Sequence, residues 1–273
     1  MAIHPLAVQH LARKVLLLIV LAVTVAAIVW WRSDGSEVKQ TSGVNQTTTE
    51  IKTTPSQAGF NKEQHSVNDP NSIWVVVNKG RLLPSSYVPA DLVVPNVSLN
   101  ESFESDNMHL RQEPATALEK MTQAATTEGL ELMLVSGYRS YGTQQSVYGG
   151  YVASQGKAYA DTTSAQPGYS EHQTGLAADL GVQSGKCQLE ACFGDMAEGK
   201  WLAVNAYKYG FIIRYQRDES ALTGYAYEPW HMRYVGTDLA AEINKSSQTL
   251  EQFFGLAAYT DYPPRAYELK VGT

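Results

Sequence analysis

The stretch "YSEHQTGLAADLGV", Tyr169 to Val182, sets how this chain arranges its polar residues. It places His172 and Asp179 seven residues apart, with Gly175 between them. An odd separation on a regular strand points two side chains to opposite faces of a sheet. The chain must therefore turn between these two residues, and Gly175 permits a turn because glycine adopts left-handed backbone conformations without strain. The strand "LAADLGV" can then present Asp179 inward, where a carboxylate among apolar neighbours needs a charged partner or a metal ion.

A second group of polar residues follows in "YEPWHMRYVG", where Glu228 and His231 are three residues apart. Pro229 lies between them and disfavours regular strand pairing, so a bend there could make the two side chains converge. His172, Asp179 and His231 together offer two imidazole nitrogens and one carboxylate oxygen. This is a three-ligand set for catalytic zinc that leaves a fourth position for water. Glu228 then fits the base that takes a proton from that water.

The same spacings have a second interpretation that involves no metal. His172 could be a hydrogen-bonded core residue, Asp179 a capping residue and Glu228 a surface residue. Spacing alone does not separate the two interpretations, because the chain contains six histidines.

Three segments resemble one family. "SEHQTGLAAD" is similar to the Ser-x-His-x-x-Gly-x-Ala-x-Asp motif, and "EPWH" to the Glu-x-x-His motif, of the VanY-like D-alanyl-D-alanine carboxypeptidases. These are zinc peptidases that share a fold with lysostaphin-type peptidases and the hedgehog signalling domain. "SGYRSYGTQ" resembles the family's substrate-binding segment, and "WLAVNAYKYGFIIRY" and "RYVG" extend the similarity over most of residues 72–240.

The resemblance implies a role for each matched residue. His172, Asp179 and His231 would bind zinc, and Glu228 would be the catalytic base. Arg139 would bind the substrate and stabilise the tetrahedral intermediate, because a guanidinium can pair with a carboxylate or donate to a developing oxyanion. Ser170 and Gln144 would either help to hold the peptide end or make purely structural hydrogen bonds; both alternatives stay open at this point.

The activity implied is a zinc-dependent carboxypeptidase that removes the C-terminal D-amino acid from peptidoglycan stem peptides. An L,D-carboxypeptidase or an endopeptidase acting on muropeptides would use the same motifs. A non-catalytic wall-binding module, as in a hedgehog-like relative, is the alternative from a different class. Glu228 argues against it, because a binding module needs no base beside a metal-ligating histidine.

The hydrophobic pattern predicts an α+β domain, and the family resemblance implies a small central antiparallel sheet flanked by helices. Strands and helices are mixed without the regular alternation of a parallel α/β fold. Strands are expected in "SIWVVVN" (72–78), "LELMLVS" (130–136), "LAADLGV" (176–182), "GFIIRY" (210–215) and "WHMRYVG" (230–236). Helices are expected over about 114–127, 143–155, 200–209 and 237–254.

The N-terminal part of the chain predicts a membrane anchor. Residues 15–31 form an uncharged apolar run of "VLLLIVLAVTVAAIVWW", close to the length of a membrane span. We expect a cytoplasmic segment over 1–14, a transmembrane signal anchor over 15–31 and a disordered polar linker over 32–70. The peptidase domain follows over 71–258, outside the cytoplasm, with a tail over 259–273. A cleaved signal peptide is the alternative, since Val25-Ala26-Ala27 offers a small-residue cleavage pattern.

Cysteine content and charge limit the compartment and the partners. Cys187 and Cys192 are the two cysteines, and their close spacing indicates a small disulfide loop, which persists outside the cytoplasm. Zinc ligation by the pair is the alternative. The formal net charge of -6, with 21 scattered Lys and Arg residues, argues against nucleic acid as a partner. We expect a monomer whose partners are stem peptides and, through the N-terminal helix, the membrane.

Overall fold

The structure is a computed structural model, and it describes residues 59–272. Its centre is a five-stranded sheet in the order β3-β5-β6-β8-β7, in which β3 runs parallel to β5 and all other neighbours are antiparallel. The strands are β3 (Ser98–Leu99), β5 (Met133–Ser136), β6 (Ala177–Gly181), β7 (Phe211–Tyr215) and β8 (Glu228–Tyr234). Two short pairs lie apart from it: β1 (Arg81–Leu82) with β9 (Tyr267–Glu268), and β2 (Leu92–Val93) with β4 (Leu110–Arg111). The expected α+β class with a mainly antiparallel sheet is confirmed.

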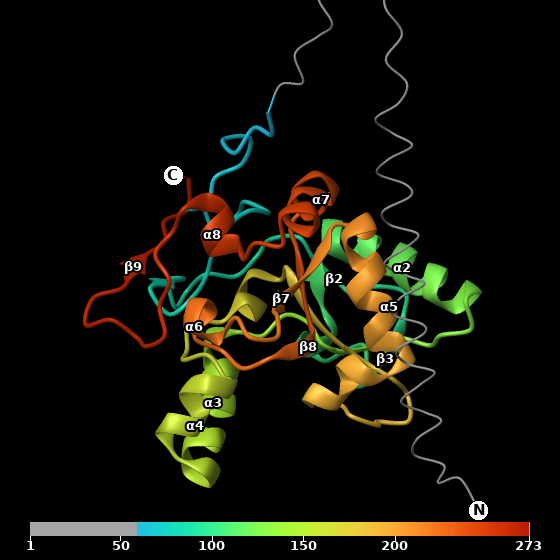
Figure 1. Cartoon of the computed structure of the whole chain (residues 1–273). Helices are drawn as coiled ribbons and strands as arrows, with labels where there is room; N and C mark the ends of the chain where they lie inside the picture. The colour runs from blue at the N-terminus through green and yellow to red at the C-terminus, as the bar shows by residue number, and fades with distance from the viewer. Residues whose placement is uncertain (1–58, 273) are drawn as a thin grey trace, which may run out of the picture. The chain divides into compact units, whose positions relative to one another are not determined.

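Helices surround this sheet (Figure 1). The α-helices are α2 (Gln112–Thr127), α3 (Tyr141–Gln155), α4 (Lys157–Thr163), α5 (Ala197–Asn205), α6 (Ser220–Thr223), α7 (Thr237–Ser246) and α8 (Leu250–Phe254). The 3-10 helices are η1 (Asp106–Met108), η2 (Glu171–Thr174), η3 (Ala191–Asp195) and η4 (Ala206–Tyr209). Helices α3 and α4 lie together at one end of the domain, and α7 packs beside β7 and η4.

The two faces of the sheet differ sharply in polarity. Because side chains alternate along a strand, every second residue of β5, β6 and β8 faces the same way. One face carries fully buried apolar side chains: Leu134, Ala178, Leu180 and Met232. They share one core with Leu118 and Met121 of α2 and Leu202 of α5. The alternate positions on β6, β7 and β8 are charged or ionisable and also buried: Asp179, Arg214, His231 and Arg233. The apolar face therefore holds the strands against the core, and the opposite face carries the ionisable residues of a polar site.

The strand expected over 72–78 is wrong. Arginine side chains donate hydrogen bonds to carbonyl groups of this segment, and none of the strands in the described residues includes it. Arg233 donates to the carbonyls of Ile73 and Val75, and Arg81 donates to that of Val76. An apolar run alone does not show which donors its backbone will meet, so "WVVV" was indistinguishable from a core strand.

The helix expected over 237–254 is interrupted. Helix α7 ends at Ser246, because Ser247 adopts a left-handed conformation with φ of 53°. Helix α8 then begins after Thr249, whose hydroxyl accepts from the backbone N–H of Gln252 while the Gln252 side chain accepts from the backbone N–H of Thr249. This reciprocal capping box is a helix start signal. Similarly, the helix expected over 200–209 begins earlier and is divided into α5 and η4.

The folded domain extends beyond the expected limits of 71 and 258. Phe60 stacks on Trp74 with ring centroids 5.4 Å apart and meets the edge of Phe253 at 5.5 Å. At the other end, β9 pairs with β1 and Leu269 is fully buried. Residues 59–70 and most of the expected tail therefore belong to the domain. The predicted anchor over 15–31 lies outside the described residues, and within 59–272 no helix combines the length and apolar character that a membrane span requires.

Candidate metal centre and active site

His172, Asp179 and His231 come together on the polar face of the sheet. Asp179 on β6 is the direct partner of His231 on β8, so their side chains share one face. His172 lies on η2, which ends at Gly175 in a left-handed conformation with φ of 67°, as the sequence predicted. The Nε2 atom of His172 is 3.2 Å from Asp179 Oδ2, and Nδ1 of His231 is 3.0 Å from Asp179 Oδ1. The three ligand atoms lie within 4.8 Å of one another.

This donor set fits a zinc ion. Two imidazoles and a carboxylate match the ligands of catalytic zinc sites. In addition, the second ring nitrogen of His172, Nδ1, donates to the Gly137 carbonyl at 2.6 Å, which leaves Nε2 as the nitrogen that would bind a metal ion beside Asp179. Cys187 and Cys192 are joined by a disulfide in the structure, so their thiolates are not available as ligands.

Glu228 lies beside the ligand set because β8 is irregular at its start. Its Oε2 atom is 3.8 Å from His231 Nδ1. Glu228 pairs with Tyr215, whereas Met232 pairs with Ile213, so β8 has more residues than β7 between these two pairs. Such a bulge re-aims side chains. Burial raises the pKa of Glu228 to about 8, and the charge of Asp179 acts in the same direction. A carboxyl group in this pKa range can accept and return a proton near neutral pH.

Arg139 is held at the edge of the metal-ligand set. Its guanidinium donates to Gln144 Oε1 at 2.9 Å and to Ser136 Oγ at 2.8 Å, and it lies 4.0 Å from Asp179 Oδ2. The amide nitrogen of Gln144 is also hydrogen-bonded within the protein, since it donates to Ser164 Oγ at 3.2 Å and to the Ala165 carbonyl at 2.6 Å. Gln144, which is 1% exposed, therefore binds Arg139 and does not bind the end of a peptide substrate.

Ser170 also makes a structural hydrogen bond. Its hydroxyl accepts from the backbone N–H of His172 at 3.3 Å and caps the N-terminus of η2. The contact fixes the backbone that carries His172. For both Ser170 and Gln144, the geometry therefore corresponds to the structural alternative.

All these side chains line a cleft of about 540 Å³. Helix α3 borders it through Thr143, Val147 and Tyr151, and the loop closed by the disulfide borders it through Gln188 and Leu189. A cleft of this volume falls within the range of small-molecule binding sites, and its lining extends from the metal-ligand set to α3 and the disulfide loop.

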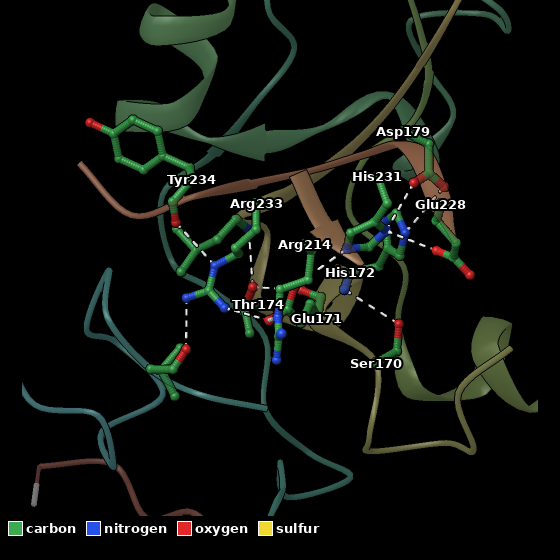
Figure 2. A network of polar contacts seen from close by, with 12 residues as sticks. Ser170, Glu171, His172, Thr174, Asp179, Arg214, Glu228, His231, Arg233 and Tyr234 are labelled. Carbon is green, nitrogen blue, oxygen red and sulfur yellow. Dashed lines mark hydrogen bonds and ion pairs between the residues drawn. The ribbon is translucent and has the colours of Figure 1, made fainter. Parts of the chain in front are cut away.

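A buried charge cluster behind His231 was not predicted. Glu171 Oε1 accepts from Arg214 Nε and Arg233 Nη1, each at 2.8 Å, and Glu171 Oε2 is 3.3 Å from His231 Nε2. Arg214 also forms a paired contact with Glu251, at 2.6 and 3.0 Å. Figure 2 shows the contacts running from the arginines through Glu171 to His231. A signal was present in the sequence: "FIIRY" and "HMRY" place an arginine in an apolar strand, which requires a buried partner.

Opposing effects set the ionisation of the ligand residues. Burial lowers the pKa of His231, but hydrogen bonds from its ring to Asp179 and Glu171 outweigh burial and raise the pKa to about 10. Burial lowers the pKa of His172 below its ordinary value. Burial opposes ionisation of Asp179, yet the adjacent His172 and His231 hold its pKa well below the usual range.

The fold and the His-Asp-His set define a zinc metallopeptidase domain. A family model described as "VanY: D-alanyl-D-alanine carboxypeptidase" matches residues 107–237, which include His172, Asp179, His231, Glu228 and Arg139. The Bacillus subtilis (strain 168) protein named "Putative carboxypeptidase YodJ" is 45% identical over 189 residues, which is 69% of each chain. This chain therefore belongs to the VanY family of zinc-dependent carboxypeptidases.

Two solved structures illustrate the range of the family. The LdcB LD-carboxypeptidase is 45% identical with a TM-score of 0.65, over 69% of this chain and 88% of that one. The vancomycin resistance D,D-pentapeptidase VanY, in complex with Zn(II), is 31% identical with a TM-score of 0.54, over 66% of this chain and 97% of that one.

Zinc binding should release protons from this site. With a pKa of about 10, His231 carries two ring protons at pH 7 in the metal-free protein, and Glu228, with a pKa of about 8, is also mainly protonated. Because zinc requires a deprotonated nitrogen, we expect release of about one to two protons per ion at pH 7 and tighter binding as the pH rises toward 10. Titration calorimetry in two buffers of different ionisation enthalpy measures this number. A binding enthalpy that does not depend on the buffer would contradict it.

Proposed function

We propose that this protein is a zinc-dependent carboxypeptidase that releases the C-terminal D-amino acid, of the D-Ala-D-Ala type, from peptidoglycan stem peptides. One observation carries the proposal: a zinc-type ligand set, a buried carboxyl group 3.8 Å from it and an arginine 4.0 Å from it share one cleft. A non-catalytic binding module would need the first of these features but neither of the other two.

Each residue has a distinct role in this proposal. His172, Asp179 and His231 would hold Zn²⁺, which when bound would lower the pKa of a water molecule and polarise the scissile carbonyl. Glu228 accepts a proton from the attacking water and returns it to the departing amine. Arg139 has five N–H donors, so its contacts with two protein side chains still leave donors for the terminal carboxylate or a developing oxyanion.

The bond that is cut has two candidates. A D,D-bond in a pentapeptide is the choice suggested by the family description, and an L,D-bond in a tetrapeptide is the second. The second candidate is favoured by one specific observation, the higher identity to the LD-carboxypeptidase, 45% against 31% for the D,D-pentapeptidase. Both reactions release a terminal D-residue and both use the same roles for Glu228 and Arg139.

We also propose that residues 15–31 anchor the protein in the cell membrane with the catalytic domain outside. The disulfide between Cys187 and Cys192 supports an oxidising compartment. If the anchor is retained, the full-length chain stays in the membrane fraction after alkaline washing. Recovery of a soluble chain that begins after Ala27 would instead support the cleaved signal peptide.

Defined muropeptides test the function directly. The protein is incubated with pentapeptide and tetrapeptide forms, and the products are identified by mass spectrometry with and without a chelator. We expect loss of one D-alanine, abolished by the chelator and restored by zinc. Loss from the pentapeptide identifies D,D-activity, and loss from the tetrapeptide identifies L,D-activity. An unchanged mass for both substrates in the zinc-loaded protein would refute the proposal.

The Glu228→Gln variant should separate metal binding from catalysis. The amide preserves the shape of the side chain but cannot accept a proton, so we expect kcat to fall by about 10²–10⁴-fold with one zinc still bound. Glu113→Gln is the matched control, because Glu113 accepts from the Tyr234 hydroxyl outside the cleft. Undiminished turnover by Glu228→Gln at full zinc occupancy would exclude the role of Glu228 as the base.

The Arg139→Ala variant should mainly impair recognition of the free C-terminal carboxylate. Loss of charge-assisted hydrogen bonds of about 1.5–3 kcal/mol predicts a decrease in kcat/KM of about 10–100-fold for peptides with a free C-terminus. Peptides with an amidated C-terminus lack that contact and should be affected much less. Arg217→Ala serves as control, since Arg217 is exposed and stacks on Tyr227. An equal loss on both kinds of peptide would argue against carboxylate recognition.

A further inference from the structure

The imidazole rings of His172 and His231 point opposite nitrogens at Asp179. His172 uses Nε2, at 3.2 Å, and His231 uses Nδ1, at 3.0 Å. The remaining nitrogen of each ring is held from behind, Nδ1 of His172 by a backbone carbonyl and Nε2 of His231 by the carboxylate of Glu171 at 3.3 Å. The acceptor on the far nitrogen determines which tautomer a histidine adopts and thus which nitrogen faces a metal.

Glu171 is held so that only one of its oxygens is left for His231. Its side chain is completely buried. Oε1 accepts from both Arg214 and Arg233 at 2.8 Å, while Oε2 points at the imidazole. Two guanidinium donors on one oxygen fix both the ionised state and the orientation of the carboxylate. An ionised carboxylate accepts hydrogen bonds but does not donate them, so Nε2 of His231 must carry the proton.

The arginines are anchored independently of the metal site. Arg214 also pairs with Glu251, whose Oε1 accepts from Asn78 at 3.0 Å, and Arg233 donates to the carbonyls of Ile73 and Val75. Two carboxylates and two guanidiniums balance in charge, which is what a buried group of ions requires. Glu171 is the member of this group that contacts a proposed metal ligand (Figure 2).

We propose that Glu171 is a positioning residue for the metal centre: clamped by Arg214 and Arg233, it selects the His231 tautomer that presents Nδ1 to the metal ion. This inference rests on the proposed zinc site. Glu171 thus has a function distinct from that of the metal ligands. Arg214 on β7 and Arg233 on β8 contribute to metal binding indirectly, because they hold Glu171 in place.

The test compares Glu171→Gln with Glu251→Gln in the full chain. Both substitutions remove one buried carboxylate that pairs with Arg214, so both should lower the Tm of the metal-free protein. Only Glu171→Gln removes the acceptor from His231. We expect its zinc affinity, measured by competition with a chelator, to fall about 10–100-fold, and its Co²⁺ absorption spectrum to shift. Glu251→Gln should keep the zinc affinity within about threefold of wild type, because Glu251 does not contact a proposed metal ligand.

A measurement on the wild-type protein covers the case in which Glu171→Gln does not fold. In the zinc-loaded protein labelled with ¹⁵N-histidine, long-range ¹H–¹⁵N spectra should show His231 protonated at Nε2 and metal-bound at Nδ1, and His172 the reverse. Metal binding by His231 through Nε2 overturns the inference, as does equal zinc affinity in the two variants. If the wild-type chain binds no zinc at all, the proposed function fails together with the inference. Zinc binding with unaltered affinity in Glu171→Gln overturns the inference alone.

Discussion

The alternation of side chains along β6, β7 and β8 is the constraint on which the active site depends. One face of these strands is apolar and packs against α2 and α5, so the alternate residues are forced onto the opposite face. There the chain places ionisable residues that are no more than 4% exposed: Asp179, Arg214, His231 and Arg233. An unpaired buried charge costs several kcal/mol, so these residues are compatible with folding only as a connected set. The metal-ligand residues and the buried ion cluster around Arg214 and Arg233 form this connected set, and the contact between His231 and Glu171 joins them.

This arrangement prepares the site before any substrate arrives. The far nitrogen of each imidazole is held by the protein, and Arg139 is fixed by Gln144 and Ser136. Side chains held in this way need little reorganisation during the reaction, and such preorganisation is a major source of catalytic power. The residues proposed to touch substrate, Glu228 and Arg139, both border the cleft, and so do Gln144 and Ser136, which hold Arg139. Removal of one member of the buried ion cluster would leave its partner charge buried and unpaired, which should destabilise the domain by about 3–5 kcal/mol.

The sequence predicted the parts of this site that depend on local rules. The turn at Gly175 followed from the odd spacing of His172 and Asp179, and the irregular pairing near Pro229 followed from its missing N–H. The set of ligand residues came from the family resemblance as much as from spacing. Non-local contacts were not predictable: the hydrogen bonds from Arg233 to the carbonyls of Ile73 and Val75, the contact of Phe60 with Phe253 and the pairing of β9 with β1 join segments far apart in the chain. Periodicity shows which face a residue occupies but not which distant group meets it.

We infer that the buried polar face forms a zinc centre with His172, Asp179 and His231 as its protein ligands. A crystal structure of the zinc-loaded protein, with diffraction data recorded on both sides of the zinc absorption edge, would locate the metal ion. We expect one anomalous peak at about 2.0–2.2 Å from His172 Nε2, a carboxylate oxygen of Asp179 and His231 Nδ1, with Nε2 of His231 still facing Glu171. No peak at this position, or a peak elsewhere in the cleft with these three side chains unbound, would contradict it.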